Sequence, residues 1–209
     1  MPTHDISNPL GWLKVSGIDA KKLLQGQLTC DVDKLPPEGS LGAHCNPQGR
    51  IISLFWLFRI DPDYYLQMPQ SLVAIALKAL QKYAVFYQVT LSDVSEAPEM
   101  PFKPTDKYTD ILSTIPAIYP ETSEKFLPHD LNLPLLGAVS FDKGCYTGQE
   151  IIARMQYLGK SKNHLSRITL PLATHPIRGT DLEHYGQVVD YYQIDYTTYE
   201  ILILTQAKK

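Results

Sequence analysis

The residue types best suited to chemistry gather in one short stretch, Phe141–Arg154 (FDKGCYTGQEIIAR). Within it, Cys145 follows Lys143 by two positions and lies between Gly144 and Gly148. A cation and the N–H groups of a helix start both favour the thiolate, the form of cysteine that attacks or ligates. Glycine marks places where the backbone bends or approaches something closely. We therefore interpret Cys145 and Lys143 as candidate catalytic residues.

The neighbours of this thiol extend the candidate site. Gln149 carries an amide that can donate and accept, and Tyr146 adds a ring and a hydroxyl. Glu150 and Arg154 stand at i and i+4 of an expected helix, a spacing that also suits an ordinary surface ion pair. Cys145 itself has a plainer reading, because a lone cysteine is often a small buried hydrophobe. No histidine adjoins it in sequence, so a Cys–His couple has no support.

Composition limits the functional classes. The chain has 209 residues, a formal net charge of −3, 44% hydrophobic and 20% charged residues, which are values of a globular protein. A slightly acidic chain is a poor match for a broad nucleic-acid-binding face. No apolar run of membrane-spanning length occurs and the first residues are polar, so we expect a cytoplasmic protein with no membrane partner. Three well-separated cysteines predict neither disulfides nor a bound metal: Cys30, Cys45 and Cys145.

Hydrophobic periodicity predicts an α+β fold built on a mainly antiparallel sheet. The first 94 residues show the order β-α-β-β-β-α-β. The expected elements are a strand at 10–15, a helix at 20–28, a hairpin of strands 41–45 and 50–60 around a glycine-bearing turn, a strand at 64–68, a helix after Pro69 and a strand at 85–91.

The second half of the chain changes character. Prolines among polar residues predict a connector over 95–107, followed by a short helix at 108–112. A helix is expected at 149–158, with Gly159 at its end. Residues 165–172, 186–194 and 199–205 read as strands of a small β-barrel-like module. We predict two domains, 1–160 and 161–209.

The stretch KGCYTGQE (143–150) resembles the signature of the YgfZ family, and other blocks of the chain occur in the order found there. These blocks are Trp12–Val32, Ala43–Arg50 (AHCNPQGR), Lys82–Phe86 (KYAVF) and Phe126–Leu133. The YgfZ family is similar to the folate-binding T-protein, the aminomethyltransferase of glycine cleavage.

The resemblance carries several expectations. It implies a T-protein-like fold with a central channel for tetrahydrofolate, and it implies that Cys145 is the functional thiol at that channel. Trp12 matches an aromatic position associated with folate, and Tyr108 is the aromatic residue nearest to a second such position. Family members maintain iron–sulfur enzymes and are tied to tRNA modification, which implies iron–sulfur client or assembly proteins as partners. Direct binding of tRNA is not expected. The cations near the signature are compatible with a small basic patch or, more plainly, with an ordinary solvated face: Lys143, Arg154, Lys160 and Lys162.

The chain departs from the T-protein pattern. The catalytic aspartate of T-proteins would fall at Ser53 or Leu54, and their pterin-holding glutamate at about Leu112, with Thr114 in place of a glycine. The connector replaces a family segment, so this is a shortened member. The leading hypothesis is an accessory protein for iron–sulfur enzymes. The alternatives are a folate-dependent one-carbon transferase and a non-catalytic binding module that has lost its folate channel.

Overall fold

The computed structural model describes residues 9–94, 96, 98–99, 106–159 and 161–206. The connector prediction therefore falls largely outside the described residues. The elements are β1 (Leu10–Ser16), α1 (Ala20–Gln27), the 3-10 turn η1 (Val32–Lys34), β2 (Ser40–Cys45), β3 (Ile51–Ile60), β4 (Asp63–Pro69), α2 (Gln70–Ala84), β5 (Thr90–Val94), α3 (Lys107–Leu112), α4 (Gln149–Leu158), β6 (Asn163–Pro171), β7 (Asp181–Leu182), β8 (Gly186–Gln193) and β9 (Thr198–Gln206).

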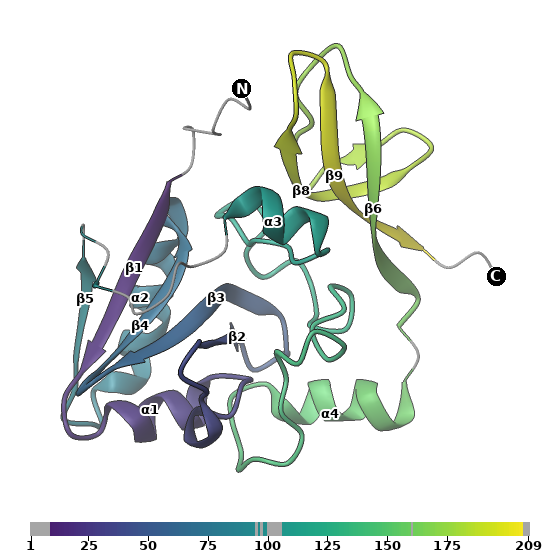
Figure 1. Cartoon of the computed structure of the whole chain (residues 1–209). Helices are drawn as coiled ribbons and strands as arrows, with labels where there is room; N and C mark the ends of the chain where they lie inside the picture. The colour runs from purple at the N-terminus through teal and green to yellow at the C-terminus, as the bar shows by residue number, and fades with distance from the viewer. Residues whose placement is uncertain (1–8, 95, 97, 100–105, 160, 207–209) are drawn as a thin grey trace.

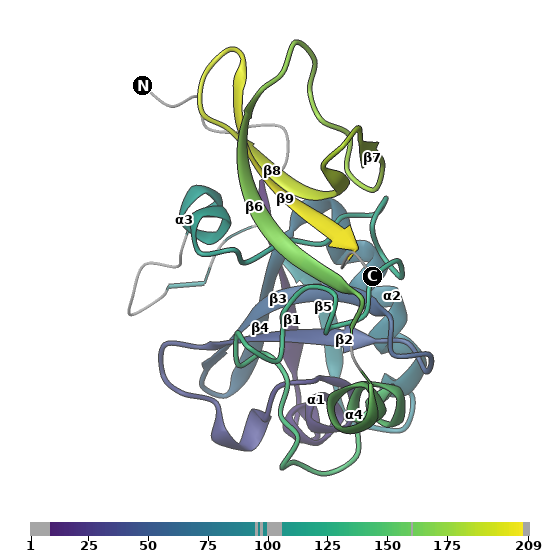
Figure 2. The same cartoon turned by 90° about the vertical axis from the view of Figure 1, so that its right-hand side faces the viewer.

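Two antiparallel sheets organise the molecule. The first has the strand order β2-β3-β4-β1-β5 and the second β6-β9-β8-β7. Helix α2 packs on the first sheet, against β1, β3, β4 and β5. Helix α3 contacts β8 and β9, and Figures 1 and 2 show it beside the long, curved strands of the second sheet. The predicted α+β class, with an antiparallel sheet and a small barrel-like module, is confirmed.

The apolar core is shared between the sheets. Strand β9 alternates its side chains, as a strand must. Leu202 and Leu204 join the large cluster formed by the first sheet, whereas Ile201 and Ile203 face a small separate cluster within the second sheet. The second sheet therefore docks on the first through a common core. The predicted division at residue 160 stays a prediction.

The hairpin of β2 and β3 turns as its sequence indicates. Asn46 accepts hydrogen bonds from the N–H groups of Gln48 and Arg50 through its side-chain oxygen, and Gly49 takes a φ of 74°. Strand β3 is buried over most of its length, which matches its nearly continuous apolar sequence.

One predicted strand is wrong. Residues 85–89 form a turn after α2, and the strand that pairs with β1 starts only at Thr90. The apolar residues that suggested a strand, Val85 and Phe86, are 73% and 81% exposed. The strand β5 lies at the sheet edge and carries little hydrophobic signal, so its sequence could not outweigh that of the turn. No helix within the described part of the chain is long and apolar enough to cross a membrane.

Candidate functional site

The predicted signature forms a loop and a helix start beside the β2–β3 turn. Gly148 is the N-cap of α4 with a φ of 85°, and a Cβ there would lie 2.6 Å from the carbonyl oxygen of Asn46. Gly49 of the β2–β3 turn is also confined, because a Cβ there would lie 3.1 Å from the Cβ of Ile151 in α4. The two glycines let the backbones of the turn and the loop touch.

Lys143 fastens the loop to the segment that follows α1. Its ammonium donates to the carbonyl oxygens of Leu28 and Cys30, both at 2.8 Å, and lies 5.2 Å from the ring centroid of Tyr146. Burial lowers the pKa of Lys143 to about 8, against an ordinary value of 10.5. The side chain predicted to assist the thiol thus makes its described hydrogen bonds to backbone carbonyls.

Thr147 adds a second attachment. Its N–H donates to the carbonyl oxygen of Gly26 at 3.2 Å, and its hydroxyl donates to Gln27 Oε1 at 3.0 Å. Both partners lie at the end of α1. The hydroxyl of Tyr146, by contrast, is buried and has no hydrogen-bond partner among the described residues, and burial raises its pKa.

Cys145 projects from the loop thus anchored. It is exposed, whereas Cys30 and Cys45 are buried. Burial raises the pKa of Cys30 to about 11 and raises that of Cys45 as well. A Cβ at Gly144 would meet no atom within 4 Å, so the chain beside the thiol is open. Of the three thiols, Cys145 alone is accessible to a reagent or partner.

The remaining predicted signature residues occupy the start of α4. Gln149 is half-buried, and its N–H donates to the carbonyl oxygen of Tyr146. Glu150 and Arg154 are exposed on successive turns. A carboxylate in the first turn of a helix is stabilised by the helix dipole, which gives Glu150 a structural role in addition to any chemical one.

A separate cavity of about 310 Å³ opens between the two sheets. Its lining combines apolar side chains with three carboxylates and a lysine: Pro9, Leu10, Pro69, Asp106, Lys107, Tyr108, Asp110, Ile115, Pro116, Ala117, Tyr119, Asp190 and Tyr192. A smaller hollow of about 40 Å³ adjoins it and reaches Trp56 and Gln67 of the first sheet. We call the two together the intersheet cavity.

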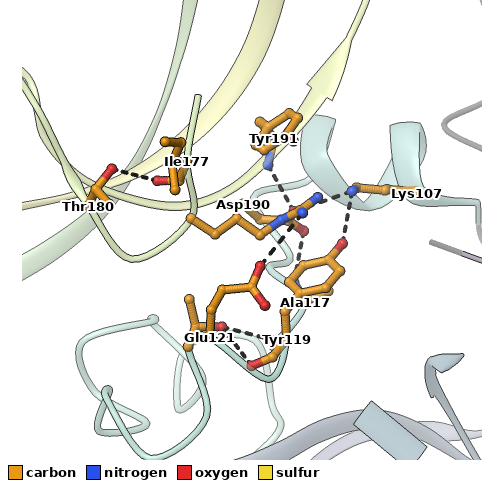
Figure 3. Close-up of polar contacts among 10 residues, drawn as sticks. Lys107, Ala117, Tyr119, Glu121, Ile177, Thr180, Asp190 and Tyr191 are labelled. Carbon is orange, nitrogen blue, oxygen red and sulfur yellow. Dashed lines mark hydrogen bonds and ion pairs between the residues drawn. The ribbon is translucent and has the colours of Figure 1, made fainter. Parts of the chain in front are cut away.

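Buried charges form one wall of this cavity. Asp190, 1% exposed, accepts from Arg178 Nε at 3.1 Å and lies 3.4 Å from the ammonium of Lys107. Lys107 also donates to the Tyr119 hydroxyl at 2.8 Å, and the Arg178 guanidinium stacks 3.8 Å from the Tyr119 ring centroid and 4.4 Å from that of Tyr191. Figure 3 shows Asp190 at the centre of these contacts. The network joins β8 to α3 and to the segment between α3 and α4.

The two residues predicted to bind folate lie in different surroundings. Tyr108 lines the cavity, is 40% exposed, and packs against Tyr192 at a centroid distance of 4.9 Å. Trp12 is 4% exposed and packs against Phe58 in the core. Cys145 is not among the residues that line the intersheet cavity. The fold therefore does not bring the thiol and the cavity into one site.

Sequence reasoning missed the carboxylates of the cavity. Asp110 lines both hollows, two positions before Leu112, the place at which the T-protein pattern has its pterin-holding glutamate. Thr114, at the place of the T-protein glycine, still takes a glycine-like φ of 59°. Asp106 caps α3, because its side chain accepts a hydrogen bond from the N–H of Thr109. Aspartate is a favoured N-cap residue, and this preference is the signal in the sequence that could have located Asp106 at the start of a helix. Nothing in sequence connects Asp190 to this region.

Comparison with known proteins gives these features a family. No family model matches the sequence. The chain aligns with the tRNA-modifying protein YgfZ of Hamiltonella defensa subsp. Acyrthosiphon pisum (strain 5AT) at 30% identity over an alignment 244 positions long. The alignment covers 84% of this chain and 72% of that protein. The chain belongs to the YgfZ family.

A second YgfZ, from Vibrio atlanticus (strain LGP32), is 31% identical over 206 residues, which cover 71% of this chain and 64% of the Vibrio protein. The match thus spans less than two thirds of that relative. The glycine cleavage system aminomethyltransferase T of Bartonella henselae superposes with a TM-score of 0.66 at 12% identity, covering 94% of this chain and 76% of that one. The T-protein-like fold expected of a YgfZ protein is confirmed.

Within this YgfZ protein, the intact signature and the cavity are two distinct regions. Among the described residues, no group of three histidine, cysteine or acidic side chains is arranged to hold a metal ion. The cations near the signature also separate. Lys143 precedes α4 in the chain and Lys162 follows it, the ten residues of the helix span about 15 Å, and Lys160 lies outside the described residues.

Proposed function

We propose that this YgfZ protein serves iron–sulfur enzymes through the thiol of Cys145. The observation that carries the proposal is the presentation of that thiol. Cys145 is exposed in a loop whose backbone is fixed on both sides, by Lys143 before it and by Thr147 after it. An accessible thiol on a preorganised loop can attack a disulfide of a partner, whose other sulfur leaves as a thiolate, or it can ligate a metal ion in transit, and it loses little entropy in doing so.

The proposal extends to the partners of this chain. The YgfZ relatives of Vibrio atlanticus and Hamiltonella defensa are named tRNA-modifying proteins. We propose that the link between this chain and tRNA modification is indirect and depends on client enzymes. An iron–sulfur enzyme that modifies tRNA would lose activity when its cluster is not maintained. The family link then requires contact with a client or assembly protein at the exposed loop.

The proposal includes a reduced folate as the ligand of the intersheet cavity. Its volume of about 310 Å³ lies at the lower end of small-molecule sites. Carboxylates such as Asp110 can accept hydrogen bonds from the amino and ring N–H groups of a pterin, and Tyr108 offers an aromatic face. The folate would supply one-carbon or redox chemistry when bound, whereas these residues orient it and exclude water.

The thiol is tested in cells that lack the gene. Complementation with Cys145→Ala should leave iron–sulfur enzyme activity as low as no complementation, while the wild-type chain restores it. Purified Cys145→Ala must unfold at the wild-type temperature, which is expected because the side chain is exposed. Full restoration by Cys145→Ala would remove the thiol from the proposal.

Folate binding is tested by titrating tetrahydrofolate and following tryptophan fluorescence, since Trp56 lines the inner hollow. Tyr108→Ala should weaken binding about tenfold, because a stacked or packed ring contributes on the order of 1.4 kcal/mol. Tyr196→Ala is the matched control, since Tyr196 is 98% exposed. If the wild-type chain binds no folate at millimolar concentration, the non-catalytic binding module becomes the better description.

The carboxylate of Asp110 also favours a second candidate, a folate-dependent one-carbon transferase. The T-protein pattern argues against this activity. Its catalytic aspartate would fall at Ser53 or Leu54, where this chain has no carboxylate, and Ser53 is fully buried in β3. Turnover of methylene- or aminomethyl-tetrahydrofolate by the purified protein, abolished in Asp110→Asn, would establish the transferase.

A further inference from the structure

A second cleft, distinct from the intersheet cavity, lies beside the C-terminal end of α4. It has a volume of about 410 Å³ and collects three cationic side chains, Arg50, Lys125 and Lys162. Arg50 lies in the turn between β2 and β3, Lys125 in the segment between α3 and α4, and Lys162 directly before β6. The fold alone assembles them, since they are 75 and 37 positions apart in sequence.

The cleft carries a net positive charge, although the whole chain has a net charge of −3. Its one acidic lining residue is Asp130, so the four charged side chains sum to +2. Asp130 is 8% exposed, and donors surround it: Ser161 and Asn163 donate to one oxygen and the Leu127 N–H to the other. These bonds hold the carboxylate in the wall and leave the cations as the dominant charges facing solvent.

The three cations are exposed and line the same cleft. Arg50 donates from Nη1 to the carbonyl oxygen of Lys125 at 2.6 Å, which fixes its guanidinium at the rim. An arginine fork with neighbouring lysines matches the geometry and charge of a phosphate group. The intersheet cavity, by contrast, has three carboxylates and one lysine in its lining.

We propose that the cleft of Arg50, Lys125 and Lys162 binds a phosphate group. The group belongs either to a small phosphate compound or to the backbone of a single RNA strand, and both sources make the same contacts. The site is independent of the proposed thiol and folate functions, because none of its residues lies in the signature or lines the intersheet cavity.

The first test maps pyrophosphate binding on the ¹⁵N-labelled wild-type chain at low salt. The side-chain amide signals of Asn163 and Gln187 should shift, because both residues line the cleft. In a parallel titration, the anisotropy of a labelled single-stranded RNA decamer reports polymer binding. Three phosphate contacts predict a slope of about −2 for the logarithm of the binding constant against the logarithm of salt concentration.

The second test uses charge-matched variants. Lys125→Gln/Lys162→Gln should weaken binding at least about tenfold, since charge-assisted hydrogen bonds are lost. Lys22→Gln/Lys78→Gln, exposed on α1 and α2, removes the same charge elsewhere and should change binding less than twofold. Pyrophosphate binding alone identifies a small phosphate compound, and RNA binding with the predicted slope identifies a strand. The proposal is overturned if pyrophosphate leaves the signals of Asn163 and Gln187 unshifted and the RNA decamer does not bind, or if both double variants lose affinity equally.

Discussion

The signature loop and the wall of the intersheet cavity each hold a lysine over a tyrosine ring, at the same distance of 5.2 Å. In the loop, Lys143 lies over Tyr146 and donates to two backbone carbonyls. In the wall, Lys107 lies over Tyr119, donates to its hydroxyl and adjoins the buried carboxylate of Asp190. One lysine is thus held by the main chain and the other by side chains.

This difference decides what each region tolerates. The loop depends on backbone approach, at Gly148 and at the carbonyls that Lys143 reaches, so changes in nearby side chains should affect it little. The wall depends on a balance of buried charges between Asp190 and two cations, so loss of one charge leaves the others uncompensated. The two regions should therefore fail under different substitutions.

The largest effect is expected in the wall. Asp190→Asn should lower the free energy of unfolding by about 3–5 kcal/mol, because Arg178 and Lys107 then lose their buried counter-charge. Denaturant unfolding measures the change. The labelling rate of Cys145 under native conditions should not move, since the loop shares none of these contacts.

Asp181→Asn is the matched control, since Asp181 is exposed on β7, and it should change stability by less than about 0.5 kcal/mol. If Asp190→Asn proves as mild as this control, the network contributes no net stability and the contrast with the loop disappears.

The next effect is expected in the loop. Gly148→Ala should cost about 2 kcal/mol, because alanine is strained at a φ of 85° and its Cβ would press on the Asn46 carbonyl. The displaced loop should change the labelling rate of Cys145 while folate binding stays as in the wild type.

Gly144→Ala provides the control within the same motif, because a Cβ there meets no atom within 4 Å. Its cost should stay below about 0.5 kcal/mol. Equal costs at the two glycines would mean that close backbone approach does not hold the loop.

The same contrast explains what could be predicted from the sequence. The signature is contiguous, and its helix was predicted with the observed limits, Gln149–Leu158, because periodicity and a terminal glycine are local signals. The antiparallel sheet followed from alternating and continuous apolar strands such as Ile51–Ile60. The misplaced strand at 85–91 shows the limit, because exposed apolar residues of a turn carry the same signal as a strand.

The cavity could not be predicted, because it exists only where distant segments meet. Asp190 lies more than 80 positions after Lys107, and no local pattern relates them. The basic cleft has the same origin. The role of Lys143 was open for another reason. Its sequence position favoured an influence on Cys145, and only the fold shows that its ammonium reaches the carbonyls of Leu28 and Cys30.

The smallest effect tests that lysine by pH. The pKa of Lys143 is about 8 in the folded protein and near 10.5 when unfolded. Between these values the unfolded chain binds more protons, so the free energy of unfolding should rise with pH. Lys143→Met lacks this contribution. The free energy of unfolding of the wild type should therefore rise by roughly 1 kcal/mol relative to that of the variant from pH 8 to pH 10, a value discounted for partial exposure. Denaturant unfolding at each pH measures this difference.

Lys78→Met, at an exposed position on α2, is the control, and its free energy of unfolding should change with pH in parallel with that of the wild type. Parallel curves for Lys143→Met as well would mean that its ammonium is not buried, and that the loop is held by Thr147 and Gly148 alone.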